Sequence, residues 1–151
     1  YDLVYGIERL IHSADPRHTI GNLVSVLEPG GRFVIVDDMP VEDRAREFAD
    51  DVARFKKLWR APVMPSAAGW CALLEDAGCD VVACRDLSPL LRPRSLDDIA
   101  RAIEEVAARR RWRDRFGLRR VGEAETGGLL LERLNRVGAA SYMMISARKR
   151  G

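Results

Sequence analysis

A helix that turns directly into a strand is encoded in residues 26–37, which read VLEPGGRFVIVD. Pro29 and the two glycines after it end the helix, because proline cannot continue one and glycine readily takes the positive φ angles of a tight helix end. The apolar run 33–36 follows at once, and a continuous run of that length is typical of a strand buried on both faces. The sequence therefore predicts a helix, a tight turn and a buried strand in this segment.

The residues before this segment complete a strand–helix–strand unit. A short apolar run at 3–5, closed by Gly6, predicts another buried strand. Asp15 as N-cap and Pro16 at the first helical position predict where the intervening helix begins. Strand, helix and strand with short joints form the parallel crossover unit of α/β proteins. We therefore expect an α/β fold.

The remainder of the chain continues the alternation of helices and strands. One amphipathic helix is predicted over residues 42–60, because its apolar residues fall on one face and charged residues cover the rest. Ser66 and Ser95 each precede a helical pattern and are predicted to cap it. The last predicted elements are a helix after Gly127 and Gly128 with an apolar stripe at Leu130, Leu131 and Leu134, and strands at 81–84 and 142–147.

The composition indicates one domain with small partners. The chain has 151 residues, 47% of them hydrophobic, which is enough for a single core. Its net charge of +2 is too small for a nucleic-acid footprint, and no apolar run approaches the ~20 residues of a membrane-spanning helix. We therefore expect neither nucleic acid nor membrane as a partner. Cys71, Cys79 and Cys84 lack paired metal-ligand spacing, so we expect buried thiols in a cytoplasmic protein.

Two short segments are predicted to lie at the ligand-binding edge of the sheet. In an open α/β sheet, ligands bind beyond the carboxyl ends of the strands. Residues 6–8, Gly-Ile-Glu, and then His12 follow the first strand, whereas residues 37–40, Asp-Asp-Met-Pro, are expected to follow the second. The fold class therefore makes both segments candidates for the functional site.

Motifs along the chain resemble one enzyme family. They are DLVYGIE at 2–8, His12, Asp15-Pro16, VLEPGGRFVIVD at 26–37, WCALLEDAG at 70–78 and SYMMISARK at 141–149. Together they are similar to the fourth to seventh strand regions of class I S-adenosylmethionine-dependent methyltransferases of the small-molecule, methyltransferase type 11-like kind.

The resemblance implies that residues 1–151 form the C-terminal part of a Rossmann-like class I methyltransferase fold. It implies strands four to seven of a mostly parallel sheet, flanking helices, and a helical insertion or lid at 89–136 before the last strand. S-adenosylmethionine is the implied cofactor, with Tyr5, Gly6 and Ile7 as its binding residues. The family's glycine-rich loop and ribose-binding acid have no counterpart here, so we expect the chain to start in mid-protein and to lack most of the cofactor site.

Glu8 and His12 are the candidate catalytic residues. An imidazole gains and loses a proton near neutral pH, which suits deprotonation of a substrate hydroxyl or carbon acid. Glu8 would recognise charge in the pocket. The alternatives are an ordinary surface or helix-start carboxylate for Glu8 and a hydrogen-bonded structural histidine for His12. His18 lies among charged residues of the following helix and is expected at the surface.

Two charged clusters allow alternative interpretations. Asp37 and Asp38 could join Glu8 around a divalent cation, but carboxylates at a strand end more often cap a turn, and we assign no metal. The cationic run 109–120, with Trp112 and Phe116 interleaved, could bind nucleic acid. We interpret it instead as a cationic helix face or a lid over an anionic substrate.

The implied activity is methyl transfer from S-adenosylmethionine to an oxygen, nitrogen or carbon of a small-molecule acceptor. The protein aligns the two reactants, and a base is needed only where the nucleophile is protonated. A catalytically silent Rossmann-like binding domain is one alternative, since folds do not dictate function. A nicotinamide-dependent oxidoreductase is the other, although the sequence lacks the catalytic Tyr and Lys at helical spacing that such enzymes usually carry after the fifth-strand region.

Overall fold

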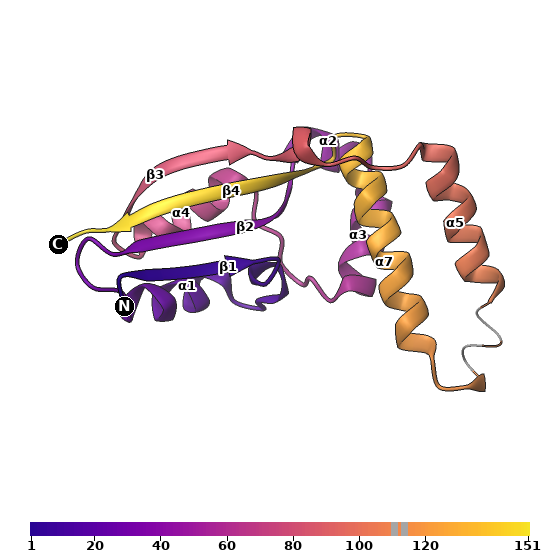
Figure 1. The fold of residues 1–151 in the computed structure, drawn as a ribbon, viewed down its shortest axis with the longest axis horizontal. Coiled ribbons are helices and arrows are strands. Elements are labelled where there is room, and N and C mark those ends of the chain that lie inside the picture. The colour runs from indigo at the N-terminus through magenta and orange to yellow at the C-terminus, as the bar shows by residue number, and fades with distance from the viewer. Residues whose placement is uncertain (110–111, 113–114) are drawn as a thin grey trace.

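The structure is a computed structural model that describes residues 1–109, 112 and 115–151. In this part of the chain, four strands form a sheet of order β1-β2-β4-β3. β1 is parallel to β2, whereas β4 lies between β2 and β3 and is antiparallel to both. The strands are β1 (Leu3–Ile7), β2 (Arg32–Pro40), β3 (Cys79–Asp86) and β4 (Ala140–Lys149). Three strands therefore run in one direction, which confirms the predicted mostly parallel sheet (Figure 1).

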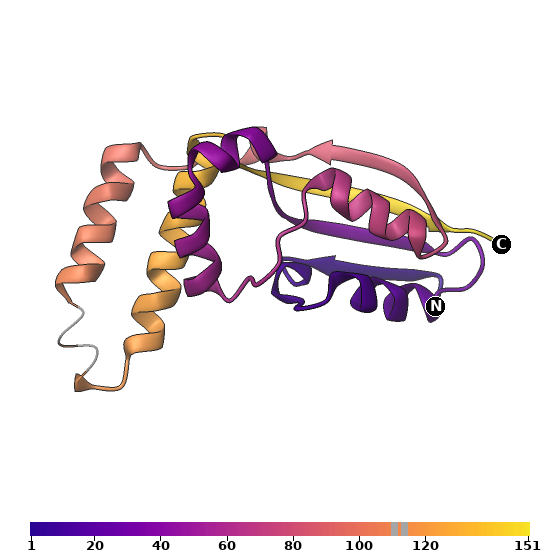
Figure 2. The ribbon, with the colours of Figure 1, turned by 180° about the vertical axis from the view of Figure 1, so that it is seen from behind.

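Two helices, α1 (Pro16–Ser25) and α4 (Ala67–Asp76), lie on the same face of the sheet (Figure 2). Both begin at their predicted caps. The Asp15 carboxylate accepts a hydrogen bond from the His18 backbone N–H at 3.0 Å, and Ser66 Oγ accepts one from the Gly69 N–H at 3.3 Å. Each cap satisfies a backbone donor that the helix itself leaves unpaired.

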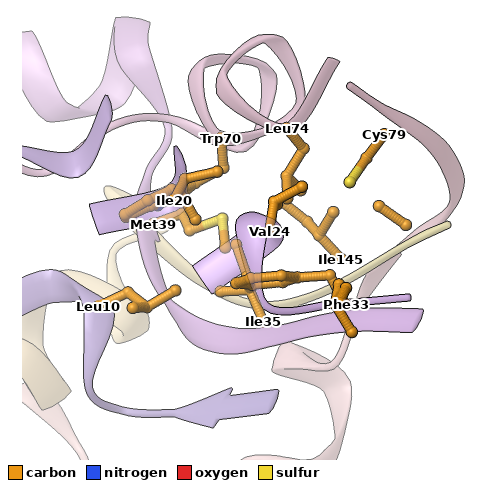
Figure 3. Close-up of a cluster of buried hydrophobic side chains, with 12 residues drawn as sticks. Leu10, Ile20, Val24, Phe33, Ile35, Met39, Trp70, Leu74, Cys79 and Ile145 are labelled. Atoms are coloured by element: carbon orange, nitrogen blue, oxygen red, sulfur yellow. The ribbon is translucent and has the colours of Figure 1, made fainter. Parts of the chain in front are cut away.

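The main core lies between the sheet and these two helices (Figure 3). Along β2, Phe33, Ile35 and Met39 point into it, as the two-residue period of a strand requires. Val34 and Val36 point to the opposite face and are only half-buried, because the helices that pack on β2 lie on the other side. The other buried members are Leu10, Ile20, Val24, Leu27, Trp70, Leu74, Cys79, Ile145 and Ala147.

A second group of helices lies at the carboxyl ends of β1, β2 and β3 (Figure 1). It consists of α2 (Glu42–Glu47), α3 (Ala49–Trp59), α5 (Leu96–Ala108) and α7 (Arg119–Arg136). α7 packs against both α3 and α5. Phe55, Leu130 and Leu134 form the centre of this second core, to which the short 3-10 helix η1 (Leu10–His12) contributes Ile11. The predicted insertion 89–136 contains α5 and α7, and its role as a lid stays a prediction.

Two predicted helices have different boundaries in the structure. The segment 42–60 forms two helices, because Phe48 leaves helical geometry at φ −111° and ψ 33°. α7 begins at Arg119 rather than after Gly128, so both glycines lie inside the helix. A Cβ atom at Gly127 would lie 2.8 Å from Trp59 Cε3. α7 approaches α3 so closely at Gly127 that a side chain would not fit, which explains a glycine inside a helix despite its low helix propensity.

β2 is longer than predicted. Asp37 and Asp38 were expected beyond the strand, but its pairing with β4 continues to Pro40, which lies opposite Ala140. Successive strand residues point to opposite faces, so the two carboxyls occupy different sides of the sheet. This placement decides the role of each in the site.

Three further predictions concern surface features. The cysteines are free, with Cys79 buried and Cys71 half-buried, but Cys84 is exposed, so its predicted burial is wrong. Residues 110–111 and 113–114 of the predicted cationic run lie outside the described residues. Trp112 and Phe116 contact each other, with ring centroids 5.0 Å apart. Among the described residues, no helix is both long and apolar enough to cross a membrane.

Candidate functional site

The buried Asp37 carboxylate fixes the loop that follows β1. Its Oδ2 accepts a hydrogen bond from the Ile11 backbone N–H at 3.1 Å, and its Oδ1 accepts one from the Asp38 N–H at 3.0 Å. Asp37 is 2% exposed. This burial raises the pKa of the carboxyl group, although the backbone hydrogen bonds oppose the rise. Asp37 therefore anchors η1, the short helix that ends in His12.

His12 is exposed at the end of η1 and contacts the end of α3. Its Nδ1 lies 3.3 Å from the backbone carbonyl oxygen of Arg60. A carbonyl oxygen can only accept, so this contact assigns the proton of the neutral ring to Nδ1. Nε2 then keeps its lone pair and is the basic nitrogen of the side chain.

Glu8 follows β1 in an unusual backbone conformation. Its φ angle is 52°, in the left-handed region that residues other than glycine rarely adopt. The Glu8 N–H donates to the Val36 carbonyl at 2.8 Å, and the hydroxyl of Tyr142 on β4 donates to Glu8 Oε1 at 3.1 Å. Glu8 is thus held by two strands. Partial burial, and then the hydrogen bond to Glu8, raise the pKa of the Tyr142 hydroxyl.

Asp38 lies on the same side of the sheet as Tyr142, directly opposite it in the ladder. The Asn135 amide on α7 donates to Asp38 Oδ1 at 2.9 Å. Burial raises the pKa of the Asp38 carboxyl to about 6, the hydrogen bond from Asn135 opposes this, and the negative charges of Asp37 and Glu8 add to it. Three acidic side chains, Glu8, Asp37 and Asp38, therefore lie near the carboxyl ends of β1 and β2.

The structure brings the predicted site residues together only in part. Glu8 approaches Asp38 through Tyr142, whereas His12 contacts Arg60 instead. Within the described chain, no three His, Cys, Asp or Glu side chains are placed to hold a metal ion. The geometry therefore does not support the alternative of a divalent cation bound by Glu8, Asp37 and Asp38.

The predicted cofactor-binding residues lie on the edge strand β1. Tyr5 is 67% exposed and Ile7 is 53% exposed, and the two point to the same face. Gly6 lies between them, where a Cβ atom would be 3.4 Å from Leu10 Cγ. Their role in cofactor binding stays a prediction.

An open pocket of about 450 Å³ lies beside His12, and three cations that the sequence predictions omitted line it. Lys56, Lys57 and Arg60 come from the end of α3, and Pro62 completes the lining with His12. No local motif distinguishes these cations from other surface cations. The Tyr142 partner of Glu8 was also missed, because the two residues are 134 positions apart in the sequence.

Comparisons with known proteins agree with this architecture. No family model matches the chain. An O-methyltransferase from Pyrenophora dematioidea is 32% identical over 93 residues, which cover 62% of this chain and 34% of that protein. The methyltransferase GfsG from Streptomyces halstedii is 29% identical over 136 residues, which cover 81% of this chain and 47% of that protein. The chain thus spans between a third and a half of the length of these relatives.

Solved structures show the same fold. The O-methyltransferase of a trans-AT polyketide synthase from Brevibacillus brevis, in complex with S-adenosyl-L-homocysteine, superposes with a TM-score of 0.64 at 18% identity. The match covers 99% of this chain and 44% of that one. This partial coverage fits the C-terminal position that the sequence motifs predict. The chain therefore has the fold of these methyltransferase structures and is similar in sequence to methyltransferases over much of its length.

Proposed function

We propose that the chain forms the acceptor side of an S-adenosylmethionine-dependent enzyme that methylates a hydroxyl group of a small molecule. The observation that carries this proposal is the hydrogen bond from His12 Nδ1 to the Arg60 carbonyl oxygen. It leaves Nε2 as an exposed base, and a hydroxyl nucleophile needs a base because its oxygen is protonated. The O-methyltransferase from Pyrenophora dematioidea supports oxygen as the acceptor atom.

The residues at the end of β1 fit the charge of the proposed cofactor. S-adenosylmethionine would supply an electrophilic methyl group on a positively charged sulfonium. The Glu8 carboxylate, which accepts a hydrogen bond from Tyr142, lies at this end of the sheet, and a negative charge there favours a cationic ligand. The exposed side chains of Tyr5 and Ile7 offer apolar surface next to it. These two residues and Gly6 would hold the methionine side.

Cofactor binding tests the class of enzyme. The test protein contains this chain behind a glycine-rich cofactor-binding half, and calorimetry compares S-adenosylhomocysteine with NADH. We expect S-adenosylhomocysteine to bind and NADH not to bind. Binding of NADH alone would instead favour an oxidoreductase, and binding of neither would favour a silent scaffold.

His12→Gln tests the proposed base in the same protein. Turnover should fall by about 100-fold or more, because general bases typically contribute factors of that size. Affinity for S-adenosylhomocysteine should stay within about twofold, since the base acts on the acceptor. His18→Gln is the matched control, because His18 is exposed on α1, where its ring forms a hydrogen bond with its helix neighbour Asn22. Full turnover in His12→Gln across the pH range would remove His12 from catalysis.

A further inference from the structure

The pocket beside His12 carries a concentrated positive charge. Lys56, Lys57 and Arg60 all line it, and of the described residues in its wall none is acidic. Lys56 is half-buried, and it also lines the adjoining pocket between α2 and α3. Three cations of one helix end therefore surround a single open space.

Lys56, Lys57 and Arg60 form no ion pair with the described residues. Across residues 1–109, 112 and 115–151, no Asp or Glu side chain forms an ion pair with Lys56, Lys57 or Arg60. Most other arginines on the helices have such a partner, as Arg133 of α7 has in Asp51 at 2.8 Å. Within the described residues, no ion pair therefore compensates the charge around the pocket.

Helix electrostatics explains only part of this cluster. Cations in the last turn of a helix interact favourably with its carbonyl groups, which accounts for Lys56 and Lys57. Arg60 differs, because it follows the helix with φ 55° and ψ 46°, in the left-handed conformation that glycine adopts with least strain. The strained conformation of Arg60 points to a use for this residue beyond ending the helix.

We propose that the methyl acceptor is an organic acid whose carboxylate binds between Lys56, Lys57 and Arg60 while its hydroxyl group faces His12. This inference rests on the proposed O-methylation and names the substrate class of that site. The planar guanidinium of Arg60 matches a carboxylate in two parallel hydrogen bonds, and the two ammonium groups add attraction. The carbonyl of the same Arg60 holds His12, so one residue would join acceptor binding to the base.

A pair of nearly isosteric probes tests the charge requirement. The protein that carries this chain behind a cofactor-binding half is labelled with 15N and titrated with 4-hydroxybenzoate or 4-hydroxybenzamide, and backbone amide shifts at 56–61 report binding. We expect the acid to bind at least about tenfold more tightly than the amide, because charge-assisted hydrogen bonds are stronger than neutral ones. Equal affinities, or no shift at 56–61 with either probe, would overturn the proposal.

Arg60→Gly separates the role of the side chain from that of the fold. Glycine relieves the left-handed strain and keeps the carbonyl that holds His12, so thermal stability should be equal or higher. The preference for the acid should nevertheless fall to about twofold or less. Arg17→Gln is the control, because Arg17 is an exposed cation of α1 paired with Asp76 at 2.9 Å, and its removal should leave the preference intact. An undiminished preference in Arg60→Gly would also overturn the proposal.

The same variants show whether the carboxylate site or the proposed methyltransferase function is wrong. In the protein with a cofactor-binding half, methyl transfer to 4-hydroxybenzoate that is insensitive to Arg60→Gly would overturn the carboxylate site and leave the methyltransferase standing. A selective carboxylate response in that protein, without binding of S-adenosylhomocysteine, would support the anion site and remove the proposed function.

Discussion

The Asp38 carboxyl makes stability depend on pH in a defined direction. Its pKa is about 6 in the folded protein and 3.8 ordinarily, so the folded state holds the proton more tightly. The free energy of unfolding should therefore fall as pH rises from about 4 to about 6. The loss is roughly 3 kcal/mol if the whole difference in pKa acts on folding.

Asp38→Asn should remove most of this loss. The amide oxygen of the new side chain can still accept the hydrogen bond from Asn135, but it carries no charge to desolvate. We expect the variant to be more stable than the wild type at pH 8 by up to about 3 kcal/mol, and similar to it at pH 4. Urea unfolding followed by tryptophan fluorescence measures this, with the exposed Asp2→Asn as control. Parallel pH curves for Asp38→Asn and the wild type would contradict it.

At the scale of elements, the contact between α3 and α7 depends on one glycine. A Cβ atom at Gly127 would lie 2.8 Å from Trp59 Cε3, and the Trp59 ring is itself stacked on Phe55 with centroids 6.1 Å apart. Gly127→Ala should therefore destabilise the protein by about 1–3 kcal/mol, as overpacking usually does. Its neighbour Gly128 is the matched control.

A Cβ atom at Gly128 would meet Trp59 only at 3.7 Å, an ordinary contact. Gly128→Ala should stabilise α7 by up to about 1 kcal/mol, because alanine has the higher helix propensity. Thermal unfolding of both variants checks the pair. Opposite signs for the two substitutions are the expected result, and a similar loss in both would mean that the helix, rather than the contact, determines the effect.

Elements that depend on local interactions could be predicted from the sequence, whereas elements that depend on distant residues could not. The caps at Asp15, Ser66 and Ser95 were identified because a capping side chain bonds to a backbone group three residues away. The extension of β2 through Asp38 depends on pairing with β4, which lies about a hundred residues later. Long-range pairing of this kind leaves no local signal in the sequence.

The same distinction holds in the site. Glu8 and His12 were candidates because they follow a predicted strand, which is a local feature. Their partners Tyr142 and Arg60 are 134 and 48 positions away, so the hydrogen bonds that orient the two candidates could not be predicted. The pKa of Asp38 depends in turn on burial and on the hydrogen bond from Asn135 of α7, and neither can be read from a sequence pattern.

At the scale of the whole molecule, β1 is an edge of the described sheet with apolar side chains exposed. Leu3, Tyr5 and Ile7 are 48%, 67% and 53% exposed. An edge strand with such side chains can pair with another chain. We therefore expect the 151-residue chain alone to self-associate, to unfold over a broad temperature range and to bind S-adenosylmethionine weakly or not at all.

Light scattering after size-exclusion chromatography tests this expectation. A Tyr5→Lys and Ile7→Lys double variant should shift the chain toward monomer, because charges on an edge strand oppose pairing. Val82→Lys is the comparison, since Val82 is 68% exposed on β3 at the opposite edge. A monodisperse wild-type chain with micromolar affinity for the cofactor would contradict the expectation, and an equal effect of Val82→Lys would move the contact to the other edge.

Both chain ends lie at the end of the sheet opposite α2, α3, α5 and α7 (Figure 1). A purification tag, a fluorescent label or a fused partner attached to either end would therefore stand away from the acceptor pocket. The amino group of Tyr1 donates to the Val26 carbonyl at 2.9 Å, and an amide N–H in a fusion could still do so. The molecule can consequently be immobilised by either terminus for ligand measurements while the pocket still faces solution.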